Sequence, residues 1–151
     1  MTAKKYKTVT YSVSILLPKF QQEVFHHLIN LKKWWPEDFE GDDIKLNSEF
    51  VFTTGDSHYS KNKVIEFVPN QKLTWLATEA IRRTDGYDWS GTKMIFELTP
   101  KDSNTIVSFT YEGVVFEDEY DRLVMICDMT LKEMFYNFIM NEKGDKALPI
   151  Q

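Results

Sequence analysis

Apolar and polar residues alternate along much of the chain between residues 44 and 113. The alternation is interrupted by turn-forming stretches at 69–72 (PNQK), at Asp85-Gly86 and at 100–104. Because successive side chains of a strand point to opposite faces, a period of two is typical of half-buried strands. An Asp-Gly pair supplies the positive φ angles of a tight hairpin. The pattern therefore predicts an antiparallel sheet of successive hairpins with one buried face.

One strand and one helical region are predicted before this sheet. Residues 6–15 alternate with a period of two, and Pro18 suits the first turn of a helix. Apolar residues then recur every three or four positions up to Leu31. Pro36 disfavours helical geometry at the residue before it, so we expect the helical region to end near Lys33.

A long final helix is predicted from about Glu119 to Asn141, with Gly144 beyond it as a stop signal. Acidic residues crowd its start, which the positive end of the helix dipole favours. Its main apolar stripe consists of Tyr120, Val124, Cys127, Leu131, Met134 and Phe138. Several methionines and Tyr136 lie off this stripe, so we expect the helix to be buried by a curved sheet or a partner.

Composition restricts the classes of function. A chain of 151 residues predicts a single domain over residues 1–151. Its net charge of -5 and pI near 5.2 argue against binding to nucleic acid or anionic membranes, whose phosphates need a basic surface. Because Cys127 is the only cysteine, neither an intramolecular disulfide nor a cysteine-based zinc site can form. The adjacent His26 and His27 diverge on a helix, which disfavours a shared metal ion.

The chain also lacks the patterns of a membrane anchor or a phosphate-binding loop. No stretch approaches the ~20 apolar residues of a membrane span. The N-terminal region alternates polar and apolar residues instead of forming the apolar core of a signal peptide. We therefore expect a cytoplasmic protein with no membrane span, no metal and no cofactor.

Four stretches, taken in order, carry a resemblance to a known family. They are LLPKFQQEVFHHLINLKKWWPEDF, NKVIEFVPNQKLTWLA, KMIFELTP and NTIVSFTYEG. They resemble the START-like (SRPBCC) superfamily, and within it the branch related to the C-terminal domain of the heat-shock-protein ATPase activator. The resemblance covers nearly the whole chain. It implies a helix-grip fold of class α+β, in which a curved antiparallel sheet wraps around a long C-terminal helix, with two short helices after the first strand.

The resemblance also implies an apolar cavity between sheet and helix, and the chain departs from the family pattern at several positions. Asn62 stands where relatives usually have glycine, and Tyr111 stands where a histidine is common. Cys127 stands where a tryptophan is frequent, which removes much side-chain volume. Either another side chain fills that space or the cavity grows.

The resemblance and the strand alternation together predict a set of cavity-lining residues. The set is Trp35, Phe52, Tyr59, Trp75, Met94, Phe96, Phe109, Tyr111, Cys127 and Leu131. Ordinary core packing is the alternative for each of them. Ligand pockets are mostly apolar with a few polar anchors. The anchors predicted here are the hydroxyls of Tyr59 and Tyr111 and the indole N–H groups of Trp35 and Trp75.

Two further features bear on this cavity. Adjacent Trp34 and Trp35 cannot both lie on one face of a helix or strand. We expect Trp34 to pack beneath the helix and Trp35, fixed by Pro36, to face the cavity.

The segment RRTDGYDWSG (82–91) forms a predicted hairpin tip. We expect this tip to cover the cavity entrance, to bind a partner protein, or only to pair its own charges.

Three functions compete. The leading hypothesis is noncatalytic binding of a small hydrophobic or aromatic molecule, either lipid-like or polyketide-like. The second is an interaction module, namely a homodimer or, less favoured, a regulator that contacts a chaperone ATPase. The third is a cyclase or hydrolase that acts inside the cavity, which requires a polar dyad among Glu66, Glu112, Tyr59 and Tyr111.

Overall fold

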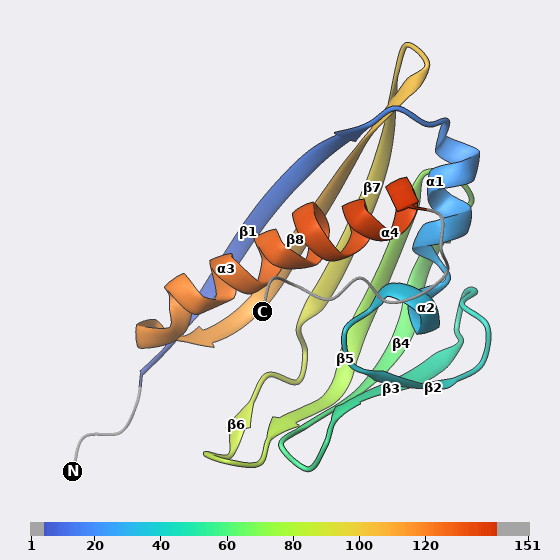
Figure 1. Ribbon diagram of the computed structural model, residues 1–151. Coiled ribbons are helices and arrows are strands. Elements are labelled where there is room, and N and C mark those ends of the chain that lie inside the picture. Colours follow the sequence, from blue (N-terminus) through green and yellow to red (C-terminus); the bar gives the residue numbers. More distant parts are fainter. Residues whose placement is uncertain (1–4, 142–151) are drawn as a thin grey trace.

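A computed structural model of the protein describes residues 5–141. One antiparallel sheet packs against a long C-terminal helix, which crosses the sheet diagonally (Figure 1). The strands are β1 (Tyr6–Leu17), β2 (Asp38–Gly41), β3 (Glu49–Thr54), β4 (His58–Val68), β5 (Lys72–Arg82), β6 (Tyr87–Asp88), β7 (Lys93–Lys101) and β8 (Asn104–Phe116). Their order is β1-β8-β7-β5-β4-β3-β2, and β6 pairs with β5. The expected α+β helix-grip fold is confirmed.

Two short helices follow the first strand, as the resemblance implied. They are α1 (Gln21–Leu28) and α2 (Leu31–Trp34). Trp35 ends α2 with an extended backbone (φ −67°, ψ 136°), the geometry that a following proline imposes. The helical region therefore ends one residue after the predicted position.

The C-terminal helix is continuous but changes its winding. It consists of a 3₁₀ turn η1 (Glu117–Glu119), α3 (Tyr120–Met129), a π-helical segment η2 (Thr130–Phe135) and α4 (Tyr136–Asn141). Inside η2 the Thr130 hydroxyl donates to the Ile126 carbonyl over 2.7 Å. The start of the predicted helix agrees with this element, which is helical as far as the described residues extend, whereas the π turn has no signal in the sequence. Gly144 lies outside the described residues.

Two irregularities interrupt the pairing of β4 with β5, one between Lys61 and Asn62 and one between Val64 and Glu66. Lys61 pairs with Glu79 but Asn62 pairs with Ala77, which leaves Thr78 without a partner on β4. Such a bulge reverses which residues of a strand face inward. Beyond it Ala80 is buried, whereas strict alternation from Ala77 would turn Glu79 inward.

The core lies between the sheet and the helices and is rich in rings. Its inward strand residues are Phe50, Phe52, Leu73, Trp75, Phe96, Leu98, Val107, Phe109 and Tyr111. Trp34 is completely buried, packs on Phe96 and Phe135, and donates from Nε1 to the Leu28 carbonyl over 3.1 Å. Burying each large apolar side chain contributes about 1.5–3 kcal/mol.

Val124 belongs to the predicted apolar stripe of the helix but does not line the space beside Cys127. It lines a separate groove together with Met125 and Asp128. Leu123 and Ile126 instead lie beside Cys127 toward the sheet.

Across residues 5–141, no helix combines the length and the apolar character that crossing a membrane requires.

Candidate ligand cavity

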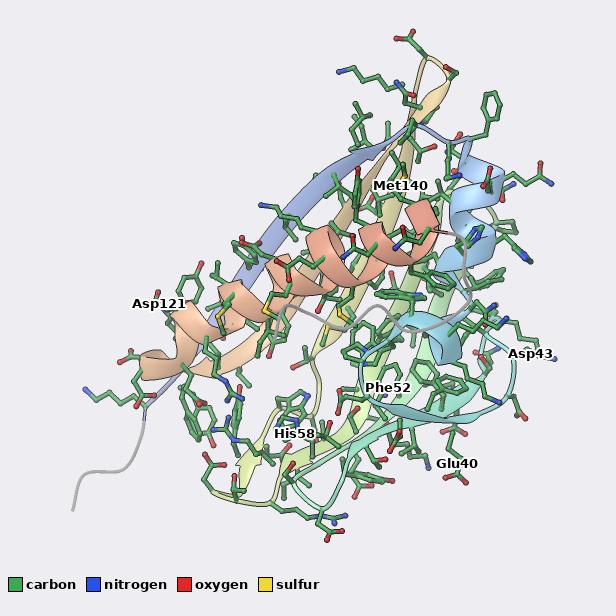
Figure 2. All side chains as sticks on the ribbon, in the orientation of Figure 1. Glu40, Asp43, Phe52, His58, Asp121 and Met140 are labelled. Atoms are coloured by element: carbon green, nitrogen blue, oxygen red, sulfur yellow. The ribbon has the colours of Figure 1, made fainter. Side chains whose placement is uncertain are left out.

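A cavity of about 180 Å³ lies between the concave face of the sheet and α3. The predicted residues that line it are Trp35, Phe52, Trp75, Met94, Phe109, Tyr111 and Cys127. Other residues complete the wall: Glu37, His58, Ser60, Asn62, Ala77, Arg82, Tyr87, Trp89, Val115, Glu119, Arg122, Leu123, Ile126 and Thr130. Phe52 and His58 lie on the sheet side of the C-terminal helix in Figure 2.

Three predicted residues do not line the cavity. Tyr59 lies between Ser60 and His58 on β4, and because those neighbours line the cavity, its ring points to the other face of the sheet. Phe96 and Leu131 point inward but are completely buried in the core. Phe96 stacks on Phe109 with ring centroids 4.5 Å apart. It therefore packs against a lining residue without lining the cavity itself.

Aromatic rings form one wall of the cavity. Trp35 stacks on Phe52 with centroids 4.7 Å apart and planes 9° from parallel. Its edge meets Trp75 at 5.5 Å in a T-shaped contact. Pairs in these geometries stabilise each other beyond their buried area, so the rings form a rigid apolar surface. Trp34 lies outside the cavity and Trp35 lines it.

Two of the four predicted polar anchors are already engaged. The Tyr111 hydroxyl donates to the Val114 carbonyl over 2.9 Å, and the Trp35 indole N–H lies 3.4 Å from a Glu37 carboxylate oxygen. Burial raises the pKa of the Tyr111 hydroxyl above its ordinary value, so it stays protonated at neutral pH. The Trp75 N–H forms no hydrogen bond within the described residues.

Sequence reasoning missed two polar residues of the wall, Ser60 and Asn62. Asn62 is 2% exposed, and its Nδ2 donates to the Ser60 carbonyl (3.2 Å) and to the Ser60 Oγ (3.1 Å). The surrounding SKNK stretch is entirely polar, so it shows no alternation. Counting back in steps of two from the buried Val64 would have placed both side chains inward.

Charged residues gather where the β5–β6 hairpin meets the start of α3. Arg82 donates to Asp85 within the hairpin and to both Glu119 oxygens, at 2.8 and 2.9 Å. Hydrogen bonds to Asp85 and then to Glu119 raise the pKa of Arg82 above its ordinary value. Tyr87 and Trp89 of the same hairpin line the cavity. The segment 82–91 therefore contributes Arg82, Tyr87 and Trp89 to the cavity wall, and Arg82 is paired with Asp85 and Glu119.

The comparison with known families agrees with this architecture. The sequence profile of the family described as Activator of Hsp90 ATPase homolog 1-like protein matches residues 23–135. The chain belongs to this family. No curated protein matches the sequence.

Solved structures share the fold of this Activator of Hsp90 ATPase homolog 1-like chain. An uncharacterized protein from Rhizobium leguminosarum superposes with a TM-score of 0.72 at 15% identity, covering 93% of this chain and 99% of that one. The Aha1 dimer from Colwellia psychrerythraea gives 0.68 at 20% identity, with coverage of 89% and 98%. Mll3558 from Rhizobium loti gives 0.68 at 18% identity, with coverage of 85% and 95%.

The groups proposed for catalysis do not meet in the cavity of this family member. Glu66 accepts hydrogen bonds from Lys72 and Thr74, which lower its pKa, and Glu112 is exposed. Burial raises the pKa of the Cys127 thiol to about 12, which disfavours the nucleophilic thiolate. Within residues 5–141, no His, Cys, Asp and Glu side chains gather closely enough to hold a metal ion.

Proposed function

We propose that this protein binds a small, predominantly apolar molecule in the cavity between the sheet and α3, without catalysing a reaction on it. The supporting observation is the cavity of about 180 Å³ with its wall of stacked rings. A dry apolar cavity of about 150 Å³ accommodates benzene, so this volume suits a molecule of one or two rings. Cys127 contributes to the proposal because a small side chain there leaves the space open.

Naphthalene binding tests the proposal. We expect naphthalene to raise the melting temperature of the native protein and to bind measurably in calorimetry. Cys127→Trp places an indole in the cavity and should abolish this binding. Met125→Trp is the matched control, because Met125 lies on the same helix, is 54% exposed and does not line the cavity. It should bind like the native protein.

Two results would count against the proposal. The first is a native protein that binds neither naphthalene nor any member of a panel of lipids, aromatics and polyketides. The second is equal naphthalene affinity in the native protein and a folded Cys127→Trp variant, which would place the ligand elsewhere.

Exposed apolar side chains favour a second function, self-association into a homodimer. Met125, Tyr136 and Met140 are exposed on the C-terminal helix, and the Colwellia psychrerythraea relative is described as a dimer. We expect light scattering after size exclusion to show a concentration-dependent dimer that Met125→Glu abolishes. Leu46→Glu, at an exposed apolar residue away from this helix, should retain the dimer. A native monomer at every concentration contradicts this function.

A further inference from the structure

Two hydrogen-bonding atoms of the cavity wall have no partner within the described residues. They are Asn62 Oδ1 and Trp75 Nε1, on side chains from residues that are 2% and 1% exposed. In residues 5–141, every polar side-chain atom that is sealed from solvent-sized space has a hydrogen-bond partner. Both atoms must therefore border open space, and the cavity is the space that both residues line.

The orientation of the Asn62 amide follows from its contacts. Its Nδ2 lies 3.2 Å from the Ser60 backbone carbonyl oxygen. A carbonyl oxygen only accepts hydrogen bonds, so the NH₂ group has to face Ser60 and Oδ1 has to face away from it. The indole N–H of Trp75 only donates. The pair therefore offers one acceptor and one donor on almost fully buried side chains. The other polar wall residues whose side chains form no hydrogen bond within residues 5–141, His58 and Trp89, are partly exposed.

These two atoms come from neighbouring strands on the same face of the sheet. Asn62 on β4 pairs with Ala77 on β5, and Trp75 lies two residues before Ala77. Diagonal neighbours of this kind have Cα atoms about 7–8 Å apart. One small molecule in the cavity can therefore contact both side chains, with its ring against Trp35 and Phe52.

The charge of the wall restricts what this pair can recognise. Neither Asn62 nor Trp75 is ionisable. The charged residues elsewhere on the wall are engaged: Arg82 and Arg122 contact Glu119, and Glu37 contacts Trp35 and Thr54. The His58 ring lies against Trp89. A carboxylate would place its negative charge against the accepting Oδ1, and an ammonium would place its positive charge against the donating N–H. Burying a charge without a partner is costly. A neutral group that both donates and accepts matches the pair.

We propose that the cavity selects flat apolar molecules that carry a neutral N–H or O–H donor beside a carbonyl acceptor, as in an aromatic lactam or carboxamide. The donor of the ligand bonds to Asn62 Oδ1, and its carbonyl accepts from Trp75 Nε1. This inference rests on the proposed function, since it specifies the ligand class of the same cavity.

Three probes of similar shape test the proposal in calorimetry. Isoquinolone is a bicyclic lactam with an N–H beside its carbonyl. Isocoumarin keeps the carbonyl but replaces the N–H with a ring oxygen, and naphthalene lacks both groups. We expect isoquinolone to bind about tenfold more tightly than isocoumarin, because one buried hydrogen bond is lost in the exchange.

Two variants assign the two hydrogen bonds. Asn62→Leu removes the acceptor, so isoquinolone and isocoumarin should bind with equal affinity. Trp75→Phe keeps a ring but removes the donor, so both carbonyl probes should weaken about tenfold relative to naphthalene. Trp34→Phe is the control, because the Trp34 N–H bonds to Leu28 outside the cavity. It should keep the native preference.

The outcomes separate this inference from the proposed function. Equal affinity of the native protein for all three probes overturns the inference and leaves apolar binding intact. Binding of none of them counts against the proposed function itself. A persistent isoquinolone preference in Asn62→Leu also overturns the assignment. If thermal unfolding shows that Asn62→Leu does not fold, the native preference and Trp75→Phe still decide the question.

Discussion

Gly113 on β8 lies close to Thr92, the residue between the β6 hairpin and β7. A Cβ atom on Gly113 would lie 2.6 Å from Thr92 Oγ1 and 3.1 Å from Thr92 Cα. The Thr92 hydroxyl donates to the Trp89 carbonyl over 2.7 Å and lies 3.5 Å from the Tyr111 hydroxyl. A side chain at position 113 would therefore push the hairpin away from β8.

We predict that Gly113→Ala lowers the free energy of unfolding by about 1–3 kcal/mol, the usual cost of overpacking. Urea denaturation followed by tryptophan fluorescence measures this change. Glu112→Ala, at the exposed neighbouring residue, should stay within about 0.5 kcal/mol of the native value. Equal stability of the two variants would show that the hairpin adjusts to the extra atom.

Single residues also show where sequence reasoning reaches its limit. The different surroundings of Trp34 and Trp35 follow from Pro36, because the extended backbone at Trp35 turns its ring away from the helix. The engagement of the Tyr111 hydroxyl by the Val114 carbonyl depends on how β8 continues past Gly113. Asn62 occupies a position that alternation from Val64 could have found, but its polar neighbours hide the pattern.

At the scale of elements, the bulge at Thr78 determines the wall of the cavity near the hairpin. The alternation of Leu73 and Trp75 correctly predicts which face of β5 is buried. Extended past the bulge, the same alternation would turn Ile81 inward, whereas Arg82 lines the cavity. Bulges and the π turn of η2 insert one residue without a consistent sequence signal, so the strands and the helix are predictable and this part of the site is not.

The Arg82–Glu119 ion pair joins this hairpin to the start of the C-terminal helix. The Arg82 side chain is 12% exposed and that of Glu119 is 19% exposed. Charged hydrogen bonds that are largely shielded from water contribute about 1.5–3 kcal/mol. We predict that Arg82→Met lowers the free energy of unfolding by about 2 kcal/mol and speeds release of bound naphthalene, measured by urea denaturation and stopped-flow fluorescence.

Arg122→Met provides the comparison, because Arg122 contacts the same carboxylate at 3.4 Å from a side chain that is 49% exposed. Exposed pairs contribute about 0.2–1 kcal/mol, so its effect should be the smaller one. The opposite ranking of the two variants would mean that Arg82 does not hold the hairpin to the helix.

At the scale of the whole molecule, the architecture is predictable because every strand and helix carries its own periodic signal. The cavity depends on contacts between segments far apart in the chain. Tyr11 on β1 donates to Asp128 on α3 over 2.7 Å, and Arg82 meets Glu119. Such contacts set how closely the helix approaches the sheet, and local sequence patterns do not encode that distance.

Two groups at the contact between helix and sheet make the stability of the fold depend on alkaline pH. Burial raises the pKa of Cys127 from 9.0 to about 12, and the hydrogen bond with Asp128 raises that of Tyr11 from 10.0 to about 12. Above the ordinary values, the unfolded chain releases these protons while the folded chain retains them. The stability that these two protons contribute is thus fully present below pH 9 and is lost as the pH rises toward 12.

We predict that the free energy of unfolding decreases steadily from pH 9 to pH 11, beginning with the thiol. One proton retained only by the folded state lowers stability by up to about 1.4 kcal/mol per pH unit. Urea titrations at half-unit steps measure the slope. Cys127→Ala removes the thiol, so its slope between pH 9 and 10 should be shallower than that of the native protein. A native stability that stays constant or rises over this range would mean that Cys127 ionises freely in the folded protein, and hence that water already reaches the cavity wall beside it.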